Sequence, residues 1–218
     1  MNLSEHQEAK LQEKGHIHWI DKETNNIYKI YKKFNFLDNL KDIEKRLSQI
    51  VKLSYSMDFI PQTNYFYEED LLVMKQKYLI DKKKLKGIDP SKKISLIKKF
   101  SQSLDKLYEE GFVHGDINRK NIIYYRNSLF LVDFEPSLLQ LKNQTKQWMS
   151  TRPYRYHEDI QNNNITVKSD FLGFACFAKW FLFNTNCPQH YAEECSKIIT
   201  KLKFQTSTFQ KLTKLLVN

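Results

Sequence analysis

Two short polar motifs in the second half of the chain carry residue types that suit phosphate chemistry. HGDINRKN begins at His114, and DFE begins at Asp133, twelve residues after Asn121. Asp116 and Asn121 stand five apart, so one loop can turn both side chains toward one cleft. Asp116 would lie near an incoming hydroxyl, Asn121 toward a metal ion, and Asp133 could hold Mg²⁺ on a triphosphate. The motifs therefore predict phosphoryl transfer, in which a protein mainly positions groups and neutralises charge on the transferring oxygens.

The residues before and between these motifs predict the elements that hold them. Asp89-Pro90 combines an N-cap residue with proline at the first helical position, and apolar residues recur at helical spacing until Gly111 ends the helix. Apolar residues at about 122–124 and 129–132 predict two short strands. The first motif thus follows a helix stop, and the second follows a strand.

The region after the second motif changes from an irregular stretch to helices. Residues 169–183 are apolar on almost all sides but too few to span a bilayer, which predicts a buried core helix and no transmembrane segment. Residues 191–217 show amphipathic spacing and predict one or two further helices.

The first part of the chain has strand patterns instead. HIHWI after Gly15 and NIYKIYK from Asn26 flank a turn at Thr24-Asn25-Asn26, which predicts a hairpin. The spacing of apolar residues predicts an amphipathic helix over 37–53. Two more strands are predicted at about 64–68 and 71–78.

The two motifs resemble those of the protein kinase-like superfamily. HGDINRKN is similar to the catalytic loop H-R-D-x-x-x-x-N, and DFE falls where the family has D-F-G. The resemblance places Asp116 as the base and Asn121 and Asp133 as metal ligands, with Glu135 as a further candidate ligand. His114 is interpreted as a structural histidine that holds the loop. ATP and Mg²⁺, or Mn²⁺ in its place, are the implied cofactors.

The resemblance also implies an architecture. We expect an α+β, bilobal protein kinase-like fold with a small β-rich N-lobe that carries one helix and a helical C-lobe. A single domain would cover residues 1–218, with the N-lobe at 1–80 and the C-lobe at 81–218.

The nucleotide-binding residues of the first half follow from the same resemblance. IYKIY around Lys29 resembles the strand that carries the phosphate-binding lysine, and apolar residues flank Lys29 at alternate positions. Lys32 is the alternative. Glu44 would pair with this lysine from the predicted helix, with Asp42 as the weaker candidate.

The adenine-binding linker is expected after Leu72-Val73-Met74, at roughly Lys75 to Tyr78. Met74, Gln76 and Tyr78 are its predicted nucleotide contacts.

Two downstream stretches extend the resemblance. The sequence from Thr151 to Glu158 looks like the end of a kinase activation segment, with a Thr and a Tyr in the usual places before the Glu. Asp170 would begin the central helix and hydrogen-bond the backbone of the catalytic loop, although Ala175 replaces the usual glycine. No arginine follows Arg155, so Glu158 lacks the distal arginine that it pairs with in large kinases.

Several departures leave the acceptor open. No G-x-G-x-x-G is present, because Gly15 is the only glycine before Gly87. Gly115 replaces the arginine that reads a phosphorylated activation loop, as in RIO kinases and lipopolysaccharide core kinases. Glu135 gives a DFE form similar to that of choline kinases, and Asn118 stands where Ser/Thr kinases carry lysine.

Three functions are therefore weighed. The activation-segment resemblance favours a protein Ser/Thr acceptor. The departures favour a sugar, lipopolysaccharide-core or other small-molecule acceptor. The missing glycine-rich loop motivates a pseudokinase, a binding module without turnover.

Composition limits the partners only broadly. The chain has 218 residues and a net charge of +10, carried mainly by lysine, since only five residues are arginine. An anionic glycan or nucleotide is compatible with this balance, and nucleic-acid readout is disfavoured because it relies on arginine. The lysines between residues 82 and 99, Lys93 among them, are interpreted as solvated. Three widely spaced cysteines and a polar N-terminus without an apolar stretch favour a cytoplasmic protein with reduced thiols.

Overall fold

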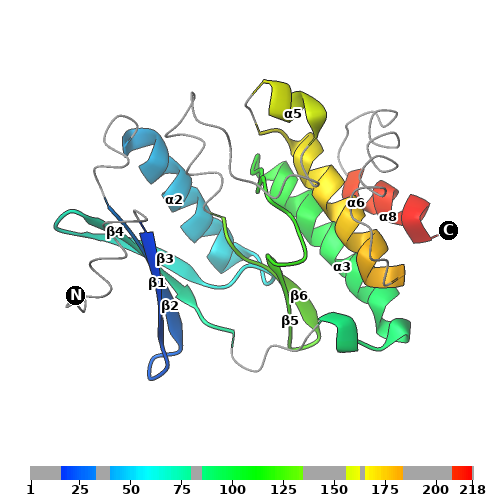
Figure 1. The fold of residues 1–218 in the computed structure, drawn as a ribbon, viewed down its shortest axis with the longest axis horizontal. Helices are drawn as coiled ribbons and strands as arrows, with labels where there is room; N and C mark the ends of the chain where they lie inside the picture. The colour runs from blue at the N-terminus through cyan, green and yellow to red at the C-terminus, as the bar shows by residue number, and fades with distance from the viewer. Residues whose placement is uncertain are drawn as a thin grey trace. The chain divides into compact units, whose positions relative to one another are not determined.

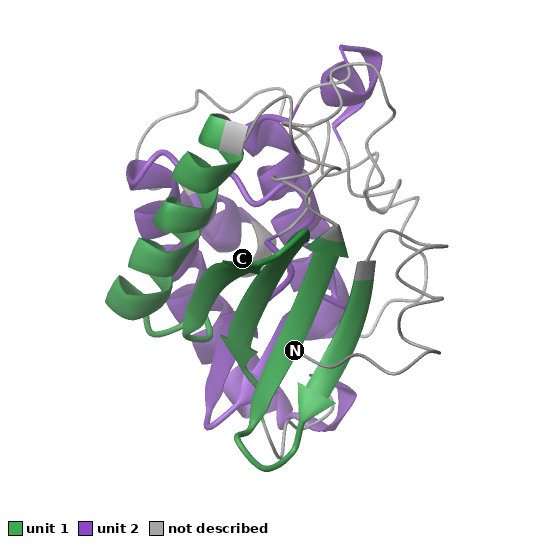
Figure 2. Cartoon of the chain, turned by 90° about the vertical axis from the view of Figure 1, so that its left-hand side faces the viewer, with its two compact units in different colours: residues 1–81 green, residues 82–218 purple. Residues whose placement is uncertain are grey.

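The chain forms two compact units, Met1–Asp81 and Lys82–Asn218, which Figure 2 colours separately. The computed structural model describes residues 16–32, 40–79, 85–134, 156–162, 165–183 and 208–217. The first unit contains an antiparallel sheet and a helix, and the second is mainly helical. The predicted α+β class is therefore confirmed.

The sheet of the first unit has four strands in the order β1-β2-β4-β3, with every neighbouring pair antiparallel. The strands are β1 (His16–Asp21), β2 (Asn26–Lys32), β3 (Thr63–Glu68) and β4 (Leu71–Lys77). Asp21 closes the first hairpin, because its carboxylate accepts hydrogen bonds from the backbone N–H groups of Glu23 and Thr24 at 2.9 and 3.2 Å. The predicted hairpin is confirmed.

Helix α2 (Leu40–Ser56) covers one face of this sheet. Ile43, Leu47 and Ile50 are at most 1% exposed, as an amphipathic helix requires. Ser54 Oγ accepts a hydrogen bond from Thr63 N at 3.0 Å, so the C-terminal part of the helix is joined to β3. The helix ends three residues beyond the predicted end at 53, because its last residues are polar and apolar spacing cannot mark them.

The opposite face of the sheet carries a separate apolar cluster. Ile17, Ile30 and Val73 are each at most 7% exposed, and Tyr28 and Leu71 pack against them. The alternation of side chains along β2 places Lys29 on the other face, the one that α2 covers.

The second unit is built around three helices, α3 (Pro90–Glu109), α6 (Val167–Phe183) and α8 (Thr208–Val217), which lie side by side in Figure 1. Its shorter elements are η2 (Leu85–Gly87), β5 (Ile122–Tyr125), β6 (Ser128–Leu131) and α5 (His157–Gln161). Asp89 caps α3 by accepting from Ser91 N at 2.9 Å, and Gly111 follows its end with φ of 70°. Both predicted limits of this helix are confirmed.

Aromatic side chains fill the core between these three helices. The Phe100 ring of α3 lies 6.3 and 6.2 Å from the rings of Phe174 and Phe177 on α6. Phe209 of α8 lies 4.4 Å from Phe171. The predicted buried helix is thus α6, which begins two residues before the predicted 169.

A buried carboxylate attaches α8 to α3. Asp105 is 3% exposed, and it accepts hydrogen bonds from the backbone N–H groups of Phe209 at 2.9 Å and Gln210 at 3.1 Å. These groups belong to the first turn of α8, which has no intrahelical acceptor for them. Asp105 therefore acts as an N-cap supplied by another helix.

We expect Asp105→Ala to lower the free energy of unfolding by about 2 kcal/mol, since charge-assisted bonds to buried N–H groups are lost. Urea denaturation followed by circular dichroism measures this. Asp89→Ala, which removes the exposed cap of α3, is the matched control and should cost less. Equal losses in the two variants would contradict the role given to Asp105.

One lysine corrects the interpretation of residues 82–99 as solvated. Lys93 is 3% exposed, and its ammonium lies 5.3 Å from the centroid of the Phe181 ring. A cation over an aromatic face retains an electrostatic partner when it is desolvated, which explains why this position can be buried.

Candidate active site

The HGDINRKN loop is attached to the first turn of α6. Asp170, which is 2% exposed, accepts hydrogen bonds from His114 N and Gly115 N, both at 2.7 Å. The predicted bond between Asp170 and this loop is confirmed. Gly115 has φ of 86°, a conformation that glycine adopts without the cost of a Cβ atom.

His114 connects the loop to the strand end that precedes Asp133. Its ring is fully buried, Nδ1 accepts from Asp116 N at 3.2 Å, and Nε2 lies 2.9 Å from Val132 O. Because Val132 O can only accept, the proton is assigned to Nε2. Both ring nitrogens are thus used in holding backbone, which supports the structural role predicted for His114.

Asp116 and Asn121 are in direct contact. Asn121 Nδ2 donates to Asp116 O at 2.9 Å and to Asp116 Oδ2 at 3.0 Å, and the Asn121 side chain is largely buried. This fixes the amide orientation, so Oδ1 is the Asn121 atom able to coordinate a cation. Asn121 O also accepts from Val132 N at 2.9 Å, which joins this residue to the chain beside Asp133.

Asp133 occupies an uncommon backbone conformation. Its φ is 64°, in the left-handed region that aspartate tolerates better than most residues. The next residue, Phe134, is 2% exposed, and its ring lies 4.7 Å from the His114 ring and 5.6 Å from that of Phe112. This packing offsets the cost of the turn and fixes the Asp133 position.

The donor set suits magnesium. Asn121 and Asp133 offer an amide and a carboxylate oxygen, and Mg²⁺ is commonly held by one or two such groups together with substrate phosphates. Across the described residues no three His, Cys, Asp or Glu side chains gather into a complete metal site. Glu135, the third predicted ligand, lies outside the described residues.

Asn118 has an internal role in the loop. It is 2% exposed, its Nδ2 donates to Asp116 O at 3.1 Å, and its Oδ1 accepts from Lys120 N at 2.8 Å. Lys120 and Arg119 are exposed. Asn118 therefore shapes the backbone around Asp116 and does not present a polar end to a substrate.

Gly173 also shapes the site, by allowing α6 to approach the loop closely, and this role was not predicted from the sequence. A Cβ atom at this position of α6 would lie 2.2 Å from Ile117 O, next to Asp116. Only glycine allows this close approach of helix and loop. A glycine inside an otherwise apolar helical stretch was the available signal.

In the first unit, Lys29 lies on the face of the sheet that α2 covers. Lys29 is 3% exposed and pairs in register with Met74, which is also 3% exposed. Met74 pairs in turn with Tyr65, whose hydroxyl lies 3.1 Å from Ser48 Oγ on α2. Lys29 is therefore buried on the helix side of the sheet. The side chains of the alternatives, Lys32 and Asp42, are outside the described set.

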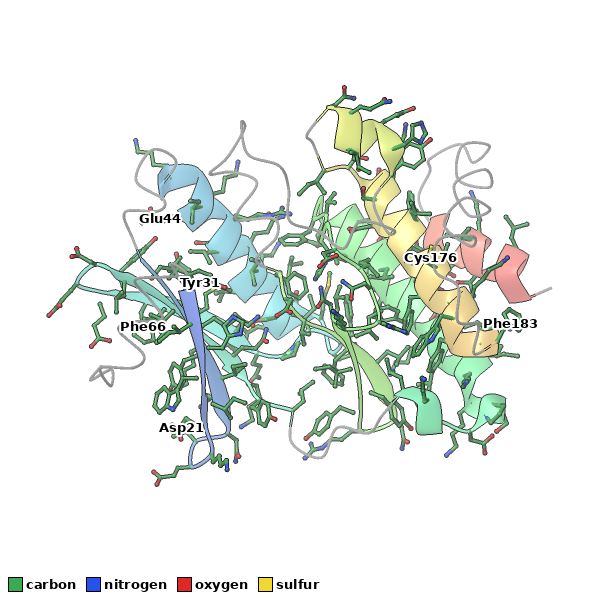
Figure 3. The ribbon with its side chains drawn as sticks, viewed as in Figure 1. Asp21, Tyr31, Glu44, Phe66, Cys176 and Phe183 are labelled. Carbon is green, nitrogen blue, oxygen red and sulfur yellow. The ribbon has the colours of Figure 1, made fainter. Side chains whose placement is uncertain are left out.

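Glu44 on α2, labelled in Figure 3, lies near Tyr67 of β3. Desolvation, followed by the charge of Glu44, raises the pKa of Tyr67 to about 12. The carboxylate of Glu44 thus faces the same side of the sheet as Lys29.

We expect titration of the Tyr67 phenol, followed by absorbance near 295 nm, to give a pKa well above the ordinary 10.0. The raised pKa means that the folded state favours the neutral Tyr67 phenol over the phenolate. The stability that this preference contributes is complete below pH 10.0 and is lost as the pH rises through about 12. Glu44→Gln should lower the Tyr67 pKa, and Tyr67→Phe identifies the signal. An unchanged pKa in Glu44→Gln would place Glu44 elsewhere.

Residues 75–77, predicted as part of the linker, lie in strand β4. Strand β4 continues through Lys77, because Lys77 N donates to Gln62 O at 2.8 Å, and Tyr78 N donates to Asn25 O at 2.9 Å. The Gln76 side chain donates to Thr63 Oγ1 at 3.1 Å, which accounts for its burial. The backbone N–H groups of Lys77 and Tyr78 are therefore already bonded within the first unit.

The structure thus gathers Asp116, Asn121 and the chain next to Asp133 in the second unit. Lys29, Glu44, Met74, Gln76 and Tyr78 belong to the first unit. Their roles toward a nucleotide remain predictions.

No described helix is long and apolar enough to cross a membrane.

Comparison with known proteins relates the sequence to one family. The sequence model described as "Protein kinase domain" matches residues 16–215. The chain is 24% identical over 126 residues to the serine/threonine-protein kinase PknH of Mycobacterium bovis, an alignment that covers 54% of this chain and 20% of that protein. PknH of Mycobacterium tuberculosis gives the same identity and covers 54% and 19%. The chain therefore spans about a fifth of the length of these relatives.

Proposed function

The chain belongs to the protein kinase domain family, and we propose on this basis that it transfers the γ-phosphate of ATP, with Mg²⁺, to a protein Ser or Thr hydroxyl. The observation that carries the proposal is the contact of Asn121 Nδ2 with Asp116 O and Oδ2. It keeps a carboxylate and an amide oxygen oriented in one loop, with His114 and Asn121 both joined to Val132 beside Asp133.

Each side chain then has a task. Asp116 accepts the proton of the acceptor hydroxyl while the hydroxyl oxygen attacks the γ-phosphorus. The bond between this phosphorus and the β–γ bridging oxygen breaks, and ADP is the leaving group. Asn121 Oδ1 and the Asp133 carboxylate hold Mg²⁺, which when bound supplies charge neutralisation on the phosphates. His114 and Asp170 keep the backbone of the loop in place.

Residues of the first unit would hold the nucleotide. Burial of Lys29 on the α2 side of the sheet suits an ammonium that binds phosphate oxygens, and Glu44 on α2 would orient it. Met74 would line the adenine site, with Gln76 and Tyr78 next to it. In this proposal, a residue beyond Tyr78 supplies the backbone N–H group that binds the edge of the purine.

A protein acceptor is favoured by two observations. The relatives are named serine/threonine-protein kinases, and the backbone at Tyr156, inside the stretch Thr151 to Glu158 that resembles the end of an activation segment, is held in a buried site. Position 118 favours the alternative, a sugar, lipopolysaccharide-core or small-molecule acceptor. It carries a buried asparagine where Ser/Thr kinases usually have a lysine that reaches the reaction. The lack of a glycine-rich motif keeps a pseudokinase as the second alternative.

The test is transfer of label from γ-labelled ATP by the purified chain. Casein serves as the protein probe, with glucose and choline as small-molecule probes, and Mg²⁺, Mn²⁺ and EDTA as the metal conditions. Label on casein or on the chain itself, abolished by EDTA, supports the proposal. Label only on a small molecule favours the alternative acceptor. Thermal stabilisation by ATP with no labelled product favours the pseudokinase.

A further inference from the structure

Segment 156–162 is joined to the start of α6 by a buried carboxylate. Asp159, which is 3% exposed, accepts from Thr166 N at 2.9 Å, from Thr166 Oγ1 at 2.8 Å and from Ser169 Oγ at 2.6 Å. Thr166 Oγ1 itself accepts from Lys168 N at 3.2 Å, as an N-cap side chain of α6 does. Asp159 therefore fixes both the cap and the first turn of this helix.

Ser169 passes this constraint to the backbone at Tyr156. While its hydroxyl donates to Asp159 Oδ2, the same oxygen accepts from Tyr156 N at 3.1 Å. Tyr156 is 1% exposed, so its N–H group lies in a site where an unpaired donor would be costly. The chain of contacts runs from Tyr156 N through Ser169 Oγ to Asp159.

The residue after Ser169 is Asp170, whose carboxylate binds His114 N and Gly115 N. One turn of α6 thus holds the backbone beside Asp116 and also the backbone at Tyr156. A displacement of this turn would move both together.

Glu158 does not take part in this network. Its carboxylate contacts Lys168 Nζ at 2.5 Å, with 47% of the Glu158 side chain and 29% of the Lys168 side chain exposed. Lys168 lowers the pKa of Glu158, but an exposed pair of this kind contributes little to stability. The neighbouring carboxylate, Asp159, is the buried and multiply bonded one.

We propose that Asp159 is a positioning residue for the acceptor, acting through Ser169 on the backbone at Tyr156, within the stretch Thr151 to Glu158 that resembles the end of a kinase activation segment. The proposal rests on the proposed function, since it concerns the acceptor side of the same reaction. It assigns the anchoring of this stretch to Asp159 and Ser169, whereas Glu158, for which the sequence offers no distal arginine, pairs with Lys168.

The test compares four variants of the full chain. Asp159→Asn keeps the size of the side chain but replaces one accepting oxygen by an NH₂ group, which cannot accept from Thr166 or Ser169. Ser169→Ala removes the hydroxyl that accepts from Tyr156 N. Ser169→Thr retains the hydroxyl as the conservative rescue, and Glu158→Gln is the matched control at the adjacent exposed carboxylate. Thermal denaturation selects the variants that fold.

The first measurement needs no catalysis. Hydrogen exchange at Tyr156 N should be at least about tenfold faster in Asp159→Asn and Ser169→Ala, because the opening free energy of a buried bonded amide falls. It should change less than twofold in Ser169→Thr and Glu158→Gln. If Asp159→Asn does not fold, Ser169→Ala decides. Equal exchange in Ser169→Ala and Glu158→Gln would overturn the proposal.

The second measurement is the kinetics of casein labelling. The KM for casein should rise about tenfold in Asp159→Asn and Ser169→Ala, with the KM for ATP within twofold of its starting value. A fall in kcat alone, or equal changes in both KM values, would overturn the positioning role. The exchange rates could change as expected while neither the unchanged chain nor any variant transfers label. In that case the contact of Asp159 and Ser169 with the Tyr156 backbone is supported and the proposed function fails.

Discussion

Asp116→Asn is expected to lower the rate of phosphate transfer by about 10²–10⁴-fold, the usual contribution of a positioned general base. Asparagine has the size of aspartate, and its side-chain oxygen can still accept from Asn121 Nδ2, as Asp116 Oδ2 does at 3.0 Å. The variant therefore loses the negative charge and the basicity while the loop keeps its shape. Initial rates with γ-labelled ATP at saturating casein measure the effect.

The control is Asp89→Asn, in which the changed carboxylate is exposed and caps α3 far along the chain from the loop. Its transfer rate should match that of the unchanged chain within twofold. Melting temperatures of the two variants distinguish a chemical loss from unfolding. Full transfer by a folded Asp116→Asn variant would remove Asp116 from the reaction.

Gly173→Val is expected to damage both stability and activity. The first added carbon would lie 2.2 Å from Ile117 O and 3.1 Å from Ile117 C, and these backbone atoms cannot rotate away as a side chain can. Overpacking of this kind costs about 1–3 kcal/mol and more where the neighbour is rigid. Because Ile117 follows Asp116, any relief of the clash displaces the loop that holds the base.

Gly87→Ala provides the comparison for this variant. A Cβ atom at Gly87 meets nothing within 4 Å, so its unfolding midpoint should stay close to that of the unchanged chain. Urea midpoints and label transfer are measured for both variants. A Gly173→Val chain as stable and active as Gly87→Ala would show that α6 and the loop are not in tight contact.

Local signals were sufficient for most elements of the fold. Asp89-Pro90 and Gly111 act through their own backbone geometry, so they marked the ends of α3 without knowledge of the rest of the chain. The all-round apolar character of α6 likewise follows from its position between other helices. The end of α2 was placed too early because its last turn is polar.

Contacts distant in sequence could not be predicted in this way. Asp105 is an ordinary acidic residue in the sequence, and only the packing of α8 on α3 shows which N–H groups it accepts from. Lys93 has the sequence neighbours of a solvated lysine, yet it lies over Phe181. Residues 75–77 were predicted as linker but lie in β4, because Lys77 N finds its acceptor in Gln62, fifteen residues before it.

The candidate site was more accessible to sequence reasoning, because Asp116 and Asn121 belong to one short loop. Their mutual contact follows from a spacing of five residues and a tight turn. Asp170 was also foreseen, through the resemblance of its helix to that of kinases. The role of Gly173 depends on its contact with Ile117, which lies 56 residues earlier and leaves no local signal of that contact in the sequence.

The cap that Asp105 provides for α8 has a consequence for how the chain folds as it is made. Phe209, whose N–H group the carboxylate binds, is separated from it by 104 residues. At a synthesis rate of about 5–20 residues per second, Asp105 precedes its partner by about 5–20 s. Helix α6, which packs on Phe100 of α3, is made within that interval, but the N–H groups that Asp105 binds are made only with α8. Completion of the second unit is therefore a late event, set by the arrival of α8.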